Sequence, residues 1–215
     1  MRVRKDFVRR EGEKSPRLIV IAAEGRDTEN IYFEAVKLRL CASDVQIEVL
    51  HRGTDESSPE NVYRQISDFM NEYNIEDDDE LWIVVDKDKW KDKMLASIAQ
   101  YCVQNDNLYF CVSNPCFELW LLLHLEDVTA YDEKQMSALA MNKKVNCRDT
   151  WLKKRMKDLT GHYHESDYNA EALLPNIDTA MQRAVTLDKS PKDRWPQDVG
   201  TRVYLLMKSI MTSPK

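Results

Sequence analysis

Residues 81–88 read LWIVVDKD, in which five apolar residues run directly into two carboxylates that flank a lysine. A continuous apolar run of this length is typical of a strand buried on both faces of a parallel sheet. A second such run, over residues 17–23, ends in Glu24. In an open parallel sheet the ligand site lies beyond the carboxyl ends of the strands, so we expect Glu24, Asp86 and Asp88 to meet there.

Strands and helices alternate on both sides of these runs. Further strands are expected over 45–50 and 108–112, and a helix start is indicated by Ser58 as N-cap with Pro59 at the first helical position. Parallel neighbours need right-handed crossover connections, so helices should cover both faces of the sheet. The sequence therefore predicts an α/β fold with a mostly parallel four-stranded sheet.

The rest of the chain divides into an N-terminal arm and a helical C-terminal region. We expect a basic arm over residues 1–16, the α/β domain over 17–125, and a helical region over 126–215 that packs on the same core. Within that last region the predicted helical segments are 116–124 at its border, then 131–157, 169–187 and 199–211.

The composition is that of an ordinary globular protein. Of the 215 residues, 43% are apolar and 32% are charged, and no apolar run approaches the ~18 residues that a membrane span requires. The N-terminus lacks the apolar segment of a secretory signal. The five cysteines, which include Cys41, contain no CxxC pair, which argues against structural zinc. We expect a cytoplasmic protein with reduced thiols and no membrane partner.

The net charge of −6 is unevenly spread. Residues 1–17 contain seven Lys or Arg and three acids, whereas residues 76–80 are all acidic. An acidic average with a basic arm is compatible with local contact to nucleic acid, although a solvated surface or a loose terminus explains the same charge runs.

Carboxylates that converge at a sheet edge favour a metal site. They repel one another strongly unless a cation neutralises them. Hard oxygen ligands that leave room for water and phosphate suit Mg²⁺, with Mn²⁺ as an alternative. A strand that ends in DxD also occurs in nucleotide-sugar transferases and in haloacid-dehalogenase-type phosphatases, and an acidic pair at a strand end can simply be solvated. The added carboxylate of Glu24 favours the metal site.

Three motifs resemble the RloB-like proteins. They are Glu24-Gly25-Arg26-Asp27-Thr28-Glu29 with Tyr32, Asp86-Lys87-Asp88-Lys89-Trp90, and the string SNPCFELWLLLH from Ser113 to His124. This family is similar in turn to the Toprim domains of the overcoming-lysogenization-defect nucleases. The resemblance runs from the basic N-terminus to residues 200–206. It implies a Toprim-like fold, metal-dependent nuclease chemistry, and a place in restriction or anti-phage loci, often beside an ATPase.

The resemblance also implies roles for single residues. Glu24 would be a metal ligand or a general acid or base, and Asp86 and Asp88 would be metal ligands. Glu29 and Glu118 are candidates to complete the site. Glu118 is informative by itself, because its helical segment is apolar nearly all round and a buried carboxylate needs a partner. Capping of its own helix start is the simpler explanation.

Candidate substrate-binding residues lie close to these carboxylates in the sequence. Lys87 and Lys89 could hold phosphates or neutralise the neighbouring acids. His124 could orient a phosphate, although a histidine near a helix C-terminus is also stabilised by the helix dipole. His162 and His164 have a spacing that could hold a metal, but they read as loop residues on the surface.

The leading hypothesis is Mg²⁺-dependent cleavage of DNA or RNA. Asp86 and Asp88 would fix a metal, while Glu24 holds a second ion or shuttles a proton. The alternative is a sensor of nucleic acid or nucleotide that regulates a partner ATPase without cutting. The chain contains no GxxxxGK[ST] loop, so nucleotide hydrolysis would come from that partner. An oligomer is compatible with the sequence.

Overall fold

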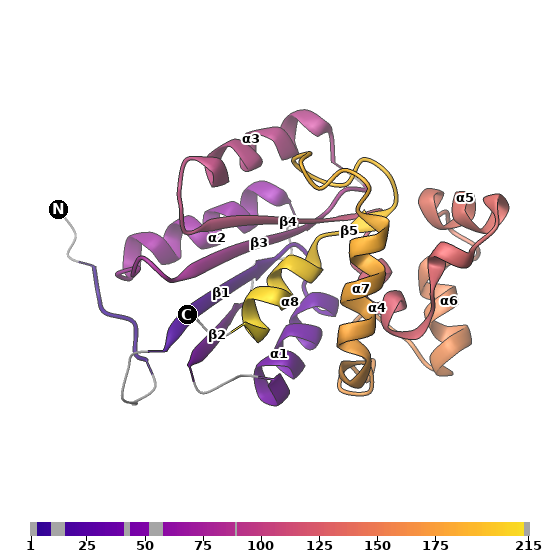
Figure 1. Ribbon diagram of the computed structural model, residues 1–215, viewed down its shortest axis with the longest axis horizontal. Coiled ribbons are helices and arrows are strands. Elements are labelled where there is room, and N and C mark those ends of the chain that lie inside the picture. The colour runs from indigo at the N-terminus through magenta and orange to yellow at the C-terminus, as the bar shows by residue number, and fades with distance from the viewer. Residues whose placement is uncertain (1–3, 10–15, 41–43, 52–57, 89, 213–215) are drawn as a thin grey trace. The chain divides into compact units, whose positions relative to one another are not determined.

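The structure is a computed structural model, which describes residues 4–9, 16–40, 44–51, 58–88 and 90–212 (Figure 1). Lys89 and Cys41 lie outside the described residues. The helices and strands are β1 (Arg17–Ala23), α1 (Thr28–Leu40), β2 (Val45–Leu50), α2 (Pro59–Glu72), β3 (Glu80–Asp86), α3 (Asp92–Val103), β4 (Leu108–Asn114), α4 (Glu118–Leu125), α5 (Glu133–Met141), α6 (Trp151–Thr160), α7 (Ile177–Leu187), β5 (Gly200–Thr201) and α8 (Val203–Met211), with 3-10 helices at Val128–Ala130 and Leu174–Asn176.

The strands form a mostly parallel sheet in the order β2-β1-β3-β4-β5. β1 pairs in parallel with β2 and with β3, so that Ile21 lies opposite Val49 on one side and Trp82 on the other. The α/β prediction is confirmed. β5 is an addition, because it pairs antiparallel with β4 over two residues only. A strand that short leaves no periodicity in the sequence, and the predicted helix over 199–211 begins at Val203 instead.

The chain divides into two compact units. The first comprises residues 1–84, 91–110 and 208–215, and the second comprises 85–90 and 111–207. In the first unit, the chain adds β2 on one side of β1 and then β3 on the other. Right-handed crossovers in these opposite directions place α1 on one face of the strands and α2 on the other, where it packs with α3 (Figure 1). All seven residues of β1 are buried, as its apolar run predicts.

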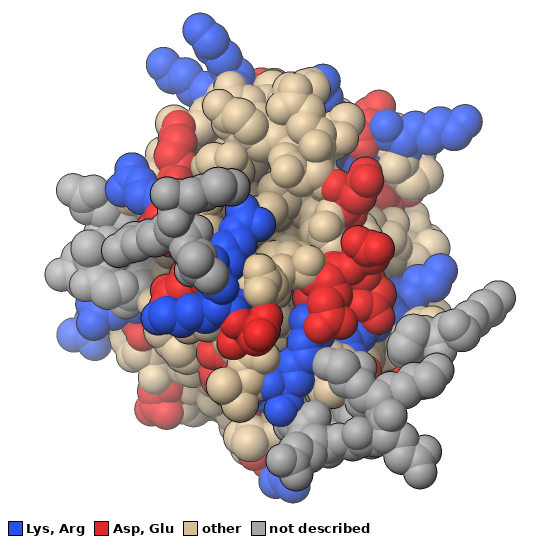
Figure 2. Space-filling view, turned by 90° about the vertical axis from the view of Figure 1, so that its left-hand side faces the viewer, with Lys and Arg blue, Asp and Glu red and all other residues tan. Residues whose placement is uncertain are grey.

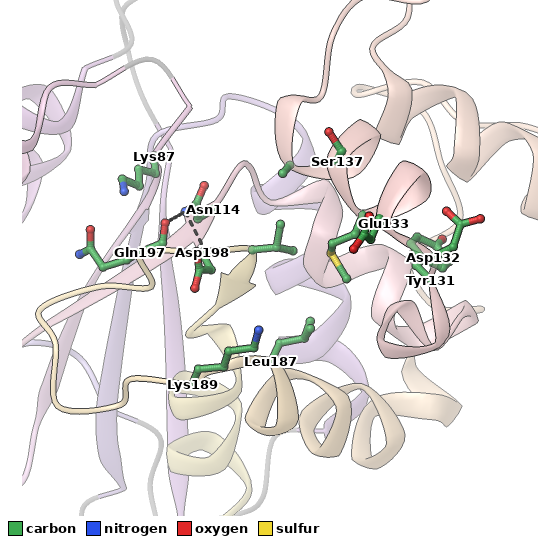
Figure 3. Close-up of a pocket in the computed structure, with 13 residues that line it drawn as sticks. Lys87, Asn114, Tyr131, Asp132, Glu133, Ser137, Leu187, Lys189, Gln197 and Asp198 are labelled. Atoms are coloured by element: carbon green, nitrogen blue, oxygen red, sulfur yellow. Dashed lines mark hydrogen bonds between the residues drawn. The ribbon is translucent and has the colours of Figure 1, made fainter.

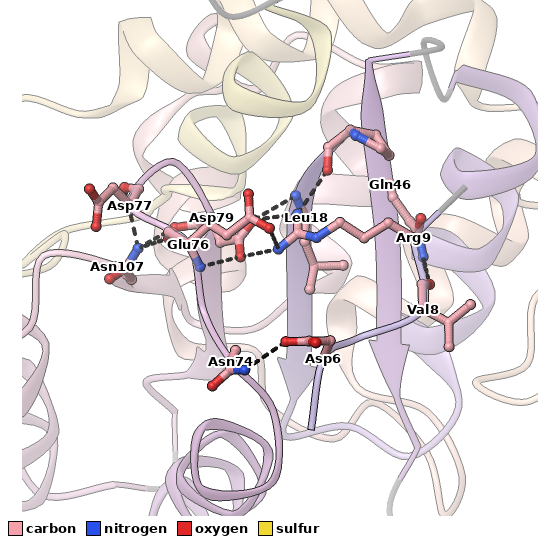
Figure 4. A network of polar contacts seen from close by, with 11 residues as sticks. Asp6, Val8, Arg9, Leu18, Gln46, Asn74, Glu76, Asp77, Asp79 and Asn107 are labelled. Carbon is pink, nitrogen blue, oxygen red and sulfur yellow. Dashed lines mark hydrogen bonds and ion pairs between the residues drawn. The ribbon is translucent and has the colours of Figure 1, made fainter. Parts of the chain in front are cut away.

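Asp79, just before β3, is neutralised inside the first unit. The Arg9 guanidinium donates hydrogen bonds to both carboxylate oxygens of Asp79, at 2.8 and 2.6 Å (Figure 4). The same carboxylate accepts the backbone N–H groups of Leu18 at 3.0 Å and Glu76 at 2.8 Å. Hydrogen bonding to Asp79 raises the pKa of Arg9. One cation of the predicted basic arm is therefore used within the protein.

A second pair follows at the first residue of β3. The Arg17 guanidinium donates to Glu80 Oε1 at 2.6 Å. Glu80 Oε2 accepts from Ser209 Oγ at 2.6 Å and from Trp82 Nε1 at 2.8 Å. The carboxylates at the amino end of β3 thus tie together segments of the first unit that are far apart in the sequence.

The second unit is built around α4, whose residues from Glu118 to His124 are all buried. α4 packs against α6 and α7. The helix predicted over 131–157 is interrupted, because Asn142 ends α5 in the left-handed region at φ 39° and α6 begins only at Trp151. None of the helices in the described part of the chain is long and apolar enough to cross a membrane.

Candidate functional site

Glu24 lies in the first unit, on the turn that follows β1. It is 5% exposed, and its backbone N–H donates to the Val84 carbonyl oxygen at 2.9 Å. Glu29, in the first turn of α1, accepts the N–H of Gly25 through Oε1 at 3.0 Å. A Cβ at Gly25 would collide with the Glu29 carboxylate, so a side chain here would displace Glu29 from the turn. Glu29 therefore fixes the turn that carries Glu24, and its role as a metal ligand stays a prediction.

Asp86 and Asp88 lie in the second unit, on a segment held by backbone hydrogen bonds. Asp86 is the last residue of β3. The N–H of Lys87 donates to the Ser113 carbonyl oxygen at 2.9 Å, and that of Asp88 donates to the Pro115 carbonyl oxygen at 3.1 Å. Asp86 is partly buried, whereas Asp88 is exposed. These bonds fix the DxD segment against the end of β4.

Three carboxylates of the second unit raise the pKa of one buried thiol, that of Cys116. Glu118 begins α4, is 6% exposed and accepts a hydrogen bond from the Tyr163 hydroxyl at 3.3 Å. Burial raises the pKa of Cys116 well above its usual range, and the charges of Glu118, Asp86 and Asp88 raise it further. The charges of Asp86, Asp88 and Glu118 thus each reach the buried Cys116 thiol.

Tyr163 is a site residue that the sequence analysis missed. It lies in the polar stretch between α6 and α7, yet it is only 1% exposed. An aromatic side chain within a polar loop was the available signal. Its hydroxyl supplies the partner that the buried position of Glu118 requires.

The chemistry of the side chains near Cys116 decides which of them could be metal ligands. A protonated thiol is a poor metal ligand, whereas carboxylates supply the oxygens that Mg²⁺ and Mn²⁺ prefer. Among the residues that the structure describes, no group of three or more His, Cys, Asp or Glu is arranged to hold a metal ion. Glu24 belongs to the first unit and the other three carboxylates belong to the second. The convergence of all four stays a prediction.

A cavity of about 710 Å³ in the second unit includes Lys87 in its lining (Figure 3). The other lining residues are Asn114, Tyr131, Asp132, Glu133, Met136, Ser137, Ala140, Leu187, Lys189, Gln197, Asp198 and Val199. Asn114 Nδ2 donates to the carbonyl oxygens of Gln197 and Asp198, both at 2.9 Å, and so fixes one wall. Two cations, several hydroxyl, amide and carboxylate groups, and apolar side chains make a lining that suits a small polar ligand.

The histidines considered as site residues, His124, His162 and His164, form hydrogen bonds within the protein. His124 is 2% exposed, and its Nδ1–H donates to the Trp120 carbonyl oxygen at 2.9 Å. Burial lowers the pKa of His124 to about 4, so its ring is neutral near pH 7. His162 and His164 are exposed and bond to Asp167 at 3.1 Å and Ser166 at 2.9 Å. The predicted role of Lys89 falls on a residue outside the described part of the chain.

The sequence was compared with known proteins. The model of the family described as RloB-like protein matches residues 19–210, which is most of the chain. Searches of the curated proteins and of the solved structures found no significant match. The motifs that resemble this family all lie within the matched range, and the chain belongs to the RloB-like family.

Proposed function

We propose that this protein is a divalent-metal-dependent nuclease, which hydrolyses phosphodiester bonds of DNA or RNA in anti-phage or restriction-linked defence. The observation that carries the proposal is the position of Asp86 at the carboxyl end of a buried parallel strand, with Asp88 two residues further on a segment that backbone hydrogen bonds fix. Ligands bind beyond the carboxyl ends of parallel strands, and carboxylate oxygens suit a divalent cation. The Toprim-like character of the α/β fold, which the resemblance implies, belongs to the same proposal.

Each residue has a distinct task in this proposal. Asp86 and Asp88 would hold Mg²⁺, which polarises a phosphate and lowers the pKa of a bound water. Tyr163 orients Glu118 by its hydrogen bond. Glu24, on the turn fixed by Glu29, holds a second ion or moves a proton. Lys87, between the two aspartates, neutralises part of the phosphate charge.

The cavity that Lys87 lines favours a second candidate function. A volume of about 710 Å³ lies within the range of small-molecule sites. Its lysines could bind a phosphate while Met136, Leu187 and Val199 contact a base. The protein would then sense a nucleotide and regulate a partner ATPase without cutting.

The test is a cleavage assay with panels of DNA and RNA in Mg²⁺, Mn²⁺ or chelator. We expect cleavage in either metal, and its loss in chelator and in Glu24→Ala and Asp86→Ala. Asp77→Ala is the matched control, because Asp77 is an exposed acid before β3. Cleavage that survives chelator or both substitutions would overturn the nuclease mechanism.

The same proteins test the sensor. A sensor predicts no cleavage, together with a rise in melting temperature when nucleotide is added. That rise should be lost in Lys189→Ala, which lies in the cavity, and kept in Lys192→Ala, which is exposed and does not line it. A rise that both variants keep would rule out this cavity as the sensor site.

A further inference from the structure

Residues 143–157 are strongly basic within an acidic protein. They contain seven Lys or Arg and one acid, a net charge of +6, while the whole chain carries −6. Elsewhere the charges are mixed: on the face in Figure 2, Lys and Arg side chains lie among Asp and Glu. The basic segment comprises the connection between α5 and α6, residues 143–150, which we call the basic loop, and most of α6.

The cations of this segment fall into two groups. Those on α6 are paired: Lys153 with Glu165, Lys154 with Asp158, Arg155 with Glu126 and Lys157 with Asp149. Those on the basic loop are Lys143, Lys144 and Arg148, and all three are exposed. None of these three side chains forms an ion pair or hydrogen bond with another residue in the described part of the chain. Their charges are available to a ligand.

The basic loop has a fixed backbone. Lys144 and Thr150 form an antiparallel bridge, and the N–H of Val145 donates to the Asp149 carbonyl oxygen at 2.9 Å. Asn146 Oδ1 accepts the N–H groups of Arg148 at 2.8 Å and Asp149 at 2.7 Å. A ligand that binds this loop therefore need not order its backbone.

Two residues next to the basic loop, Asn142 and Tyr163, bond to Cys116 and Glu118. Asn142, which directly precedes the loop, donates through Nδ2 to Cys116 Sγ at 3.3 Å. Arg148 lines a groove of about 380 Å³ together with Tyr163, and the Tyr163 hydroxyl donates to Glu118. The basic loop thus lies next to residues that contact Cys116 and Glu118.

We propose that the basic loop is a docking surface for the phosphate backbone of nucleic acid, with Lys143, Lys144 and Arg148 as the contacts. A polyanion matches three exposed cations on a fixed loop, and it would extend from them towards Glu118. Each neutralised phosphate releases counterions, which gives affinity that depends steeply on salt. The inference rests on the proposed function only in taking nucleic acid as the substrate.

The test is equilibrium binding of labelled DNA and RNA oligonucleotides, measured by fluorescence anisotropy at several salt concentrations in chelator. Chelator prevents metal-dependent cleavage, so failure of the nuclease proposal would leave this measurement unaffected. The variant is the triple Lys143→Ala, Lys144→Ala and Arg148→Ala. The matched control removes the same charge at three exposed lysines, Lys93, Lys192 and Lys208.

We expect the loop variant to lose at least about tenfold in affinity and to reduce the slope of log K against log salt by about 2 to 3, since each phosphate contact contributes about 0.9. The control should keep its slope, and both variants should keep the melting temperature of the parent. Equal losses in the two variants, or no loss in the loop variant, would overturn the proposal. So would equally tight binding to anionic lipid vesicles that the same loop residues mediate.

Discussion

The carboxylates at the two ends of β3 have different surroundings. At the amino end, Asp79 and Glu80 each accept hydrogen bonds from an arginine. At the carboxyl end, Asp86 and the nearby Asp88 act, with Glu118, on the thiol of Cys116. The first pair is neutralised by cations of the chain itself. The second group lies at and beyond the carboxyl end of a parallel strand, where the proposed divalent cation would bind.

In the proposed function, this difference separates acids that stabilise the fold from acids that bind a cation. A carboxylate with charged and backbone donors on both oxygens, like Asp79, stabilises the fold. Asp86 and Asp88 follow a buried strand at the edge of the sheet where ligands bind, which is the position expected of acids that serve a site. Substitutions at the two ends should therefore affect different properties of the protein.

The largest expected effect is on stability at the amino end. Asp79→Ala removes the two hydrogen bonds that the part-buried Arg9 guanidinium donates to this carboxylate, and it leaves two backbone N–H groups without their acceptor. We expect the free energy of unfolding to fall by about 3 kcal/mol, measured by urea denaturation, while the folded protein keeps its cleavage rate. Asp77→Ala should change stability by less than about 0.5 kcal/mol, as expected for an exposed site. If Asp86→Asn were destabilised as much as Asp79→Ala, the carboxylates at the two ends of β3 would not differ in their contribution to stability.

The next effect is on cleavage at the carboxyl end. Glu118→Gln keeps the shape of the side chain and removes its charge, so cleavage should fall about 100-fold with the fold intact. Tyr163→Phe removes the hydrogen bond to Glu118 and keeps that carboxylate, so we expect a smaller loss, about tenfold. Tyr101→Phe, at an exposed tyrosine of α3, is the control. A full rate in Glu118→Gln would show that this carboxylate only supports its helix.

The smallest effect is on the pH dependence of stability, through the buried His124. The pKa of His124 is lowered to about 4 by burial, against about 6.5 in the unfolded chain. Between these values the unfolded state binds more protons, so stability should fall as pH is lowered from 6.5 towards 4. The expected loss between pH 7 and pH 5 is roughly 2 kcal/mol, from urea denaturation. His124→Gln should lack this part of the pH dependence, and an identical slope would contradict the assignment.

Much of the frame of the molecule could be predicted from local patterns. The apolar run before Asp86 identified β3, and Ser58 caps α2 as expected, its side chain accepting the N–H of Asn61. Each of these features depends on a few consecutive residues. The α/β class followed from their alternation along the chain.

The contacts around Cys116 could not be predicted in this way. Tyr163 and Glu118 are 45 residues apart, and their bond depends on how α4 packs within the second unit. The break at Asn142 was missed because helical patterns continue on both sides of it, and only its left-handed backbone ends α5. The hydrogen bond from the Gly25 N–H to Glu29 was missed for another reason. An acid at position 29 was interpreted as a metal ligand, and the sequence does not distinguish that role from a bond within the turn.

In the proposed function, the carboxyl end of β3 holds a divalent cation. Calorimetric titration of the protein with Mn²⁺ tests it most directly, in parallel with Asp86→Asn and the exposed-acid control Asp77→Asn. We expect Mn²⁺ to bind saturably to the parent and to the control. Its binding to Asp86→Asn should be at least about tenfold weaker. Equal affinity in all three proteins, or no saturable binding to the parent, would contradict it.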